Sequence, residues 1–435
     1  MRITMIGAGY VGLVSGVCFA ELGHEVVCVD VDETRLSKLK AGVSPIFEPG
    51  LEEMMARNIA EDRLRFSADL GAAVKGASAI FIAVGTPARR GDGHADLTYV
   101  YAAAQEIAQK ADPKTVVVTK STVPVGTNAE IGRILERERP GAGLMVASNP
   151  EFLREGSAIG DFMKPDRVVV GTESEAARGV MTSIYAALSD AGAPVMFTGI
   201  ETAEMIKYGA NAFLATRITF INEMARLCER VGADISAVAQ GMGLDDRIGP
   251  RFLRAGPGYG GSCFPKDTKA LAQIGRENGQ QMSIVEAVID ANEDMKLAMV
   301  DKVRDLCDGD LEGKRIAVLG VTFKAGTDDM RDAPSLTILP ALDAMGAEII
   351  ACDPKGAQEG ATAFPFADWA ETAYAAAQDA DAVVILTEWQ CFRELDLARL
   401  AASMRTPRMA DLRNLYSGIE ARAAGFEDYE GVGRR

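Results

Sequence analysis

The sequence of 435 residues contains only two histidines, His24 and His94, and seven scattered cysteines without a C-x-x-C pair. A histidine triad, a histidine-rich zinc site or a histidine base would have to use one of these two imidazoles. The cysteines resemble neither a disulfide framework nor a zinc site. We therefore expect no metal, a reducing cytoplasmic environment, and proton transfer by Lys, Asp, Glu or Cys.

Positive charge is also scarce. The chain has 46 Lys and Arg against 62 Asp and Glu, a formal net charge of −16, which disfavours general binding to nucleic acid or to an anionic membrane. No uninterrupted run of about 18 apolar residues occurs, so we expect no membrane span. The apolar start lacks a small-residue cleavage site, so we expect no signal peptide. A hydrophobic content of 48% predicts large globular cores, and the length predicts roughly two or three domains.

Short β-branched runs alternate with helical patterns in the first part of the chain. We predict strands at 2–6, 26–30, 79–84, 115–119, 144–147 and 167–170. This alternation is typical of an α/β fold with a parallel, doubly wound sheet. Residues 201–231 contain no proline and a single glycine, which predicts one long helix. It is either an inter-domain core helix or, in addition, a dimer interface.

A second, similar sheet pattern opens near residue 314. We predict strands at 314–320, 348–352 and 382–387, and helices at 335–345 and 369–378. The fold class is therefore α/β, with two Rossmann-like doubly wound domains joined by a central helical region. We expect residues 430–435 to be frayed.

The segment Gly7-Ala8-Gly9-Tyr10-Val11-Gly12 directly follows the first predicted strand and opens a helix. Gly7 permits a tight turn, Gly9 lets the backbone approach a pyrophosphate, and Gly12 allows close packing of helix on strand. Asp30 follows 18 residues after Gly12, where its carboxylate can accept both ribose hydroxyls and would repel a 2′-phosphate. The pattern predicts an NAD site, and the alternative is a packing turn without a ligand.

The segment 256–267 is a second glycine-rich loop, and five of its first six residues are Gly or Pro. Cys263 is predicted at or just before a helix N-terminus with Lys266 near it, and both effects lower the pKa of a thiol and favour a thiolate nucleophile. Residues 247–269 contain five cations and one acid, which suits an anion such as a diphosphate. The alternative is a solvated basic face.

Three further patterns are weaker alone. Lys207 and Asn211 share one face of the long helix, where an ammonium and an amide could stabilise an alkoxide; otherwise they are helix surface. Segments 149–156 and 121–127 each follow a predicted strand, where ligands collect in doubly wound folds. They offer glutamate bases and hydroxyls, or are simply capping and strand-end turns.

An NAD site combined with a nucleophilic cysteine predicts two successive oxidations. An alcohol is oxidised to an aldehyde, and a thiolate then adds to the aldehyde carbon. The resulting thiohemiacetal can lose a second hydride and become a thioester, which water cleaves to an acid.

Together these motifs resemble the UDP-glucose/GDP-mannose dehydrogenase family over nearly the whole chain. Further matching motifs are 45–51, 85–87, 323–324, 327–331 and 411–414. The resemblance implies oxidation of UDP-glucose to UDP-glucuronate with two NAD and one water. It also implies an NAD-binding domain at 1–198, a central helical region with the cysteine loop at 199–311 that forms a homodimer, and a UDP-sugar-binding domain at 312–435. Leu412 departs slightly, since a smaller residue is common there.

The resemblance also implies roles for individual residues. Cys263 would be the nucleophile, and Lys207 and Asn211 would hold the oxyanion, with Lys207 also a base in the first oxidation. Thr122 and Asp267 would position the water, and Glu151 would assist thioester hydrolysis. The cofactor-binding set would be Gly7, Gly9, Tyr10, Val11, Gly12, Asp30, Arg35, Thr86, Thr122, Glu155, Lys266 and Arg331. The substrate-binding set would be Glu151, Phe152, Leu153, Glu155, Lys207, Asn211, Arg247, Phe252, Arg254, Tyr259, Gly260, Lys324 and Arg413. In this set, the resemblance implies that Arg247 reaches across the dimer.

Three competing functions remain open at this point. A sister enzyme would act on GDP-mannose or a UDP-N-acetylhexosamine. A two-electron hydroxyacid dehydrogenase would form one NADH per substrate and would not need Cys263. A catalytically idle nucleotide-sugar sensor would form none.

Overall fold

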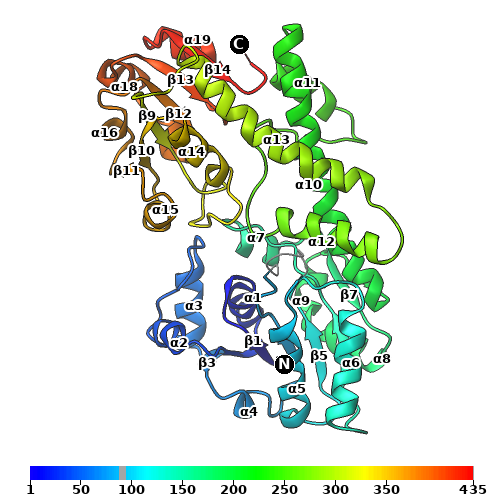
Figure 1. Ribbon diagram of the computed structural model, residues 1–435. Coiled ribbons are helices and arrows are strands. Elements are labelled where there is room, and N and C mark those ends of the chain that lie inside the picture. Colours follow the sequence, from blue (N-terminus) through cyan, green and yellow to red (C-terminus); the bar gives the residue numbers. More distant parts are fainter. Residues whose placement is uncertain (88–94, 435) are drawn as a thin grey trace. The chain divides into compact units, whose positions relative to one another are not determined.

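The computed structural model describes residues 1–87 and 95–434. The chain divides into two compact units, Met1–Ala210 and Asn211–Arg435, and the boundary lies within the long helix α10 (Ile200–Val231). Each unit contains one sheet with helices on its faces (Figure 1). The long helix predicted from residue 201 is confirmed. The division into 1–198, 199–311 and 312–435 stays a prediction, and His94 lies outside the described residues.

The first unit is built on an eight-stranded sheet of order β3-β2-β1-β4-β5-β6-β7-β8. Its strands are β1 (Arg2–Ile6), β2 (Glu25–Val29), β3 (Leu64–Ser67), β4 (Ala79–Ile82), β5 (Val116–Thr119), β6 (Met145–Ser148), β7 (Val168–Gly171) and β8 (Val195–Thr198). The doubly wound sheet is confirmed, with one correction: β6 and β7 pair antiparallel at Ser148 and Gly171. Strands β3 and β8 were not expected, because these edge strands are half-exposed and lack a continuous apolar run.

Helices cover both faces of this sheet. One face carries α1 (Tyr10–Glu21), α3 (Leu51–Ala60), α7 (Ala158–Met163), α8 (Glu175–Ile184) and α9 (Ala186–Asp190). The other carries α4 (Leu70–Ala73), α5 (Thr98–Lys110) and α6 (Thr127–Glu138), and α2 (Glu33–Lys40) follows β2. The Phe19 ring of α1 is fully buried. Its centroid lies 5.1 Å from that of Phe81, 5.0 Å from that of Phe162 and 5.6 Å from that of Tyr185. This aromatic cluster fixes α1 and α7 against the sheet.

The second unit contains a six-stranded parallel sheet of order β11-β10-β9-β12-β13-β14. The strands are β9 (Arg315–Leu319), β10 (Glu348–Cys352), β11 (Asp368–Trp369), β12 (Ala382–Ile385), β13 (Arg408–Asp411) and β14 (Asp428–Gly431). One face packs against α13 (Ser283–Leu306) and α14 (Ser335–Ala344), and the other against α16 (Ala373–Ala377) and α18 (Leu397–Ser403). The remaining helices are α11 (Ile235–Gly243), α12 (Phe264–Glu277), α15 (Ala357–Ala363), α17 (Gln390–Arg393) and α19 (Gly418–Ala423). The predicted second Rossmann-like sheet is confirmed.

Two local predictions in this unit were wrong. The helix expected over 369–378 begins only at Ala373, because Trp369 belongs to β11 and the Thr372 hydroxyl caps the helix by accepting the Ala375 N–H. Residues 430–434 are not frayed. Val432 is fully buried, and the Gly433 N–H donates to Glu229 Oε1 at 2.7 Å. A small residue at 433 lets the chain pass close to α11.

Among the described residues, no helix is long and apolar enough to cross a membrane.

Candidate active site

The glycine turn of the first unit links β1 to α1. Gly7 has a φ of +95°, and a Cβ there would lie 2.6 Å from the Ala83 carbonyl oxygen. A Cβ at Gly12 would lie 1.9 Å from the Gly7 oxygen, whereas a Cβ at Gly9 would meet no heavy atom within 4 Å. Gly7 and Gly12 are therefore required by the fold, and Gly9 leaves the start of α1 open. The turn fits a pyrophosphate at a helix N-terminus.

Asp30 follows β2 and is 6% exposed. Its carboxylate accepts the Ala8 N–H at 2.7 Å, the Asp32 N–H at 2.9 Å and Arg35 Nη1 at 2.8 Å. Burial alone would raise the pKa of Asp30, but these hydrogen bonds and the Arg35 charge hold it below its usual range. The carboxylate therefore stays ionised beside the glycine turn. A carboxylate acceptor at this position fits the ribose hydroxyls of NAD, with Arg35 next to it.

Glu151 and Lys207 form a buried ion pair within the first unit. Their side chains are 5% and 4% exposed, and Lys207 Nζ lies 3.0 Å from Glu151 Oε1. Glu151 Oε2 also accepts the Leu153 N–H at 2.6 Å. Burial raises the pKa of Glu151, but the Lys207 charge and these hydrogen bonds outweigh burial and hold the pKa below its ordinary value. The pair presents an ionised carboxylate and an ammonium in a dry setting.

Other predicted residues of the first unit lie around the ends of the same strands. The Thr86 hydroxyl donates to the Thr122 carbonyl oxygen at 3.0 Å, which joins the segments after β4 and β5. The Phe152 ring lies 5.4 Å from Lys207 Nζ and 3.7 Å from the Arg167 guanidinium carbon. Burial and Glu48 are the main causes that raise the pKa of the Tyr10 phenol, and the charge of Glu155 raises it further. The structure thus brings Thr86 to Thr122, Phe152 to Lys207, and Glu155 to Tyr10.

In the second unit, Cys263 precedes α12 and is its N-cap residue. This confirms the predicted position at a helix N-terminus. Its Sγ lies 3.6 Å from Ser262 Oγ, and its side chain is partly exposed. Of the cysteines, all of which the structure describes, Cys18, Cys28, Cys228, Cys307 and Cys352 are buried, and Cys391 is exposed.

Asp267 is fully buried in the first turns of α12. Its Oδ2 accepts Asn211 Nδ2 at 2.6 Å, and its Oδ1 accepts Lys266 Nζ at 2.5 Å. The predicted residues 211, 266 and 267 therefore form one hydrogen-bonded group, and Lys266 and Asp267 belong to the same helix α12 that Cys263 caps.

The glycine-rich loop before Cys263 packs tightly against protein. A Cβ at Gly260 would lie 2.4 Å from the Asp332 oxygen, and one at Gly261 would lie 2.8 Å from the Phe323 ring. Tyr259 is held from both sides by Asn292, whose Oδ1 accepts its N–H at 2.8 Å and whose Nδ2 donates to its carbonyl oxygen. These glycines are therefore needed for packing, and their approach to a ligand stays a prediction.

The predicted substrate-binding Arg and Lys side chains of this unit differ in the groups that they contact. Arg254 Nη2 donates to the Arg413 carbonyl oxygen at 3.1 Å, and Arg413 donates to the carbonyls of Leu386 and Phe323. Lys324 Nζ lies 5.3 Å from the Phe323 ring. Arg331 pairs with Asp329, and Arg247, with 88% of its side chain exposed, pairs with Asp245. Arg413 and Lys324 thus contact Phe323, and Arg254 contacts Arg413.

Phe252 adopts a left-handed backbone with a φ of +61°. Its ring lies 6.3 Å from that of Phe264, the first residue of α12.

Sequence reasoning missed two buried groups beside these residues. The Glu48 carboxylate accepts the Tyr10 hydroxyl and the N–H groups of Gly156 and Ala158, so it ties the glycine turn to the segment after Glu151. The ammonium of Lys120 donates to Asn149. Glu48 lies in the 45–51 motif, but no spacing rule indicates its partner. Lys120 directly follows a predicted strand, and this position could have indicated that it lies near the site.

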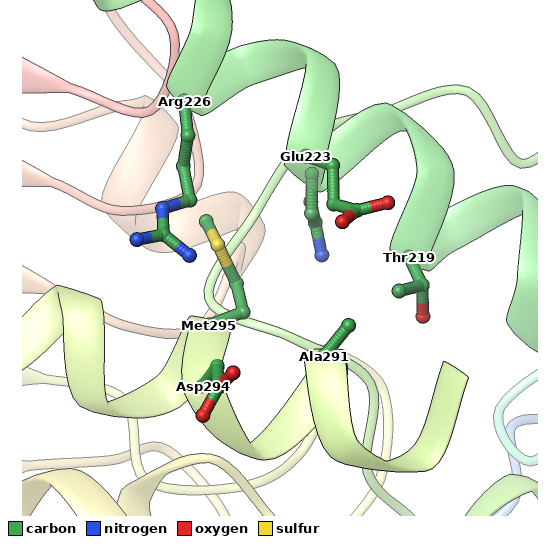
Figure 2. A pocket seen from close by; sticks show the side chains of 7 residues that line it. Thr219, Glu223, Arg226, Ala291, Asp294 and Met295 are labelled. Atoms are coloured by element: carbon green, nitrogen blue, oxygen red, sulfur yellow. The ribbon is translucent and has the colours of Figure 1, made fainter. Parts of the chain in front are cut away.

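A small pocket in the second unit is a separate feature. Figure 2 shows side chains from α10 and α13 around it. It is lined by Thr219, Asn222, Glu223, Arg226, Ala291, Asp294 and Met295. None of these belongs to the predicted site. Among the described residues, no cluster of His, Cys, Asp and Glu could hold a metal ion.

Comparison with known proteins assigns the three parts of the chain. Residues 1–189 match the NAD binding domain of the UDP-glucose/GDP-mannose dehydrogenase family, 201–294 match its central domain, and 317–418 match its UDP binding domain. The chain belongs to this family. Its cofactor is NAD, and it is a dehydrogenase.

Three relatives of the family are similar over their whole length. A UDP-glucose 6-dehydrogenase of Rhizobium meliloti is 54% identical and covers 100% of both chains. The structure of a UDP-glucose dehydrogenase from Pyrobaculum islandicum is 38% identical, with a TM-score of 0.92, and the match covers 100% of this chain and 98% of the other. A UDP-D-ManNAc dehydrogenase from Pyrococcus horikoshii is 26% identical, with a TM-score of 0.87 and coverage of 100% and 99%.

Replacing Asp30 by Ala should weaken NAD binding and relax the preference against NADP. The change removes the ribose acceptor and frees Arg35, so we expect KM for NAD to rise about tenfold and the NAD-to-NADP ratio of kcat/KM to fall. Initial rates with each cofactor give both values. Asp69→Ala is the matched control, since Asp69 caps α4 and touches no part of the turn. Unchanged cofactor kinetics in Asp30→Ala would remove Asp30 from the site.

Proposed function

We propose that the chain oxidises UDP-glucose to UDP-glucuronate, with two NAD and one water. The observation that carries this proposal is the 54% identity, over the full length of both chains, to a UDP-glucose 6-dehydrogenase. The solved UDP-D-ManNAc dehydrogenase is only 26% identical, which favours glucose over an N-acetylhexosamine as the sugar. NAD, when bound at the glycine turn, supplies the acceptor for the hydride in each oxidation.

Cys263 is proposed as the nucleophile of the second oxidation. Its position at the N-terminus of α12 favours the thiolate, and its partial exposure leaves the sulfur accessible. The thiolate attacks the aldehyde carbon, so a carbon–sulfur bond forms and the carbonyl oxygen becomes an alkoxide. Loss of a hydride from that carbon leaves a thioester. Water then adds, the carbon–sulfur bond breaks, and the acid and the thiolate are released.

Lys207 and Asn211 are proposed to stabilise the alkoxide, because an ammonium and an amide one helical turn apart on α10 can donate to the same oxygen. Lys207 also takes the hydroxyl proton in the first oxidation. Asp267, which binds Asn211 and Lys266, orients the amide and, with Thr122, the water. Glu151 is ionised beside Lys207 and is proposed to accept a proton from that water.

The nucleotide part of the substrate is proposed to bind in the second unit. Arg254, Lys324 and Arg413 supply cationic groups for a diphosphate, and their region matches the family's UDP binding domain in part. Tyr259, Phe252, Gly260 and the Glu151–Glu155 segment are proposed as further substrate contacts, and Arg247 as a contact across a dimer.

A homodimer is proposed from α10. Phe213, Phe220 and Leu227 are 64%, 47% and 50% exposed, and a spacing of seven residues places them along one side of the helix. Large apolar side chains aligned in this way favour a partner helix, and a symmetric pair of the same helix is the simplest partner. The free cysteines support a reducing, cytoplasmic location.

A count of NADH per sugar tests the proposed function. UDP-glucose, GDP-mannose, UDP-N-acetylhexosamines and simple hydroxyacids are offered separately, and NADH and product are measured at completion. We expect about two NADH for each UDP-glucose consumed and none with the hydroxyacids, as the two-step scheme requires. One NADH per substrate would indicate a two-electron dehydrogenase, and none with any sugar would indicate a sensor.

Cys263→Ala should abolish net formation of the acid, because no other group supplies the thioester. We expect kcat for formation of the acid from UDP-glucose to fall by about a thousandfold or more, while the first oxidation needs no thiol. Cys391→Ala is the matched control, since Cys391 is an exposed free cysteine of the same unit. Normal turnover in Cys263→Ala would refute the covalent route.

Glu151→Gln should slow thioester hydrolysis more than oxidation, because the amide cannot accept a proton from water. During turnover we expect a covalent adduct on the intact protein, seen by mass spectrometry as added mass. The adduct must disappear in the Cys263→Ala/Glu151→Gln double variant. Fast hydrolysis without an adduct would contradict the role of Glu151.

Phe220→Glu should weaken the proposed dimer, because it places a charge in the middle of the exposed apolar row on α10. Light scattering at several protein concentrations should show a shift toward the monomer mass. Tyr99→Glu is the control, since Tyr99 is 61% exposed on α5 of the first unit. An unchanged mass for Phe220→Glu would place the interface elsewhere.

A further inference from the structure

Lys120 is a buried lysine that the proposed chemistry does not use. It directly follows β5, its backbone N–H donates to the Ile82 carbonyl at 2.8 Å, and the residue is only 5% exposed. Burying an ammonium is costly unless it is paired and hydrogen-bonded. The contacts that hold this charge therefore indicate what it does.

The direct partner of the Lys120 ammonium is Asn149, the residue after β6. Lys120 Nζ lies 3.1 Å from Asn149 Oδ1 and 3.5 Å from the Asn149 carbonyl oxygen. The Tyr185 hydroxyl donates to the same Oδ1, and Asn149 Nδ2 donates to the Val169 carbonyl at 2.7 Å. Asn149 is thus fixed from three sides, two residues before Glu151.

The surroundings of Lys120 combine one aromatic ring and two charges. Its Nζ lies 5.9 Å from the Phe162 centroid, within the range of a cation–π contact. The charged groups that act on it are Glu151 and Lys207. The Glu151 carboxylate is bound to Lys207 at 3.0 Å, so this one buried anion interacts with both buried cations.

This charge balance affects how each group titrates. Burial and the nearby Lys207 charge lower the pKa of Lys120 to about 8, although Glu151 acts in the opposite direction. Burial raises the pKa of Glu151. The charge and hydrogen bond of Lys207 lower it most, and the charge of Lys120 lowers it further.

We propose that Lys120 is a positioning residue for the Glu151–Lys207 pair. Through Asn149 it holds the segment that leads from β6 to Glu151, so that the carboxylate is presented to Lys207. Its positive charge helps to keep Glu151 ionised, which the proposed acceptance of a proton from water requires. This inference rests on the roles proposed above for Glu151 and Lys207.

Lys120→Met tests the inference, because it keeps an unbranched apolar stem and removes the charge and the donors. We expect kcat for UDP-glucose oxidation to fall about tenfold and KM to change by less than about threefold. The limb on which kcat rises with pH should move to higher pH, because Glu151 loses a nearby positive charge and then holds its proton more firmly. Lys120→Arg retains the charge and should keep the wild-type position of that limb.

Two matched variants separate charge from structure. Tyr185→Phe removes the neutral donor to Asn149, so it should lower kcat without moving the pH limb. Lys110→Met removes an exposed lysine of α5 and should behave as wild type. NAD affinity of Lys120→Met, measured by fluorescence titration, should be unchanged and reports on folding. If Lys120→Met does not fold, Lys120→Gln is used in its place in every measurement.

The outcomes distinguish this inference from the proposed function. Wild-type kcat and pH profile in Lys120→Met, or a loss of kcat with an unmoved limb in that variant, would overturn the role of Lys120. Glu151→Gln and Lys207→Ala are measured in the same assay. If those two keep full turnover, the proposed function of the pair is wrong. If they lose turnover while Lys120→Met does not, only the role of Lys120 is wrong.

Discussion

Parallel pairing in the first sheet is the constraint on which the first half of the site depends. Strands β2, β1, β4, β5 and β6 are neighbours and run parallel, so their carboxyl ends lie at the same edge. Asp30, the glycine turn, Thr86, Lys120 with Thr122, and Asn149 with Glu151 each come within a few residues of one of these ends. Residues from distant parts of the sequence therefore meet without any local motif that joins them.

Burial gives these polar groups their chemistry. Asp30, Glu151, Lys120 and Lys207 are each no more than 6% exposed, so water screens their charges little. Each charge is retained because backbone amides or a counter-charge compensate for lost hydration. A group held in this way is already oriented before a substrate binds, which is what stabilisation of a developing alkoxide requires.

Much of this arrangement could be predicted from the sequence because the signals are local. The glycine turn and Asp30 depend on residues within one strand–turn–helix–strand unit, where spacing alone fixes geometry. The Cys263 N-cap depends only on the loop and the helix start around it. Strands β3 and β11 escaped detection because edge strands need no continuous apolar run. The contacts of Glu48 with Gly156 and of Lys120 with Asn149 join residues far apart in the sequence. Only the order of strands in the sheet brings them together, and no periodicity encodes that order.

The second sheet uses the same turn for a different purpose. Gly320 after β9 has a φ of +92°, much like Gly7 at +95°, and Asp353 after β10 accepts the Val321 N–H at 2.7 Å, as Asp30 accepts that of Ala8. A Cβ at Gly320 would lie 2.4 Å from Thr387, just as one at Gly7 would lie 2.6 Å from the Ala83 oxygen. However, the Trp389 indole N–H donates to Asp353 at 3.3 Å. The next helix, α14, begins only at Ser335, so no helix N-terminus follows the turn directly. The Asp353 carboxylate is therefore occupied by backbone and indole N–H groups of its own domain. In the first unit, by contrast, α1 begins directly after Gly9, which no other atom crowds. The same strand–turn–strand geometry thus supports a dinucleotide site only where the glycines leave the helix start accessible.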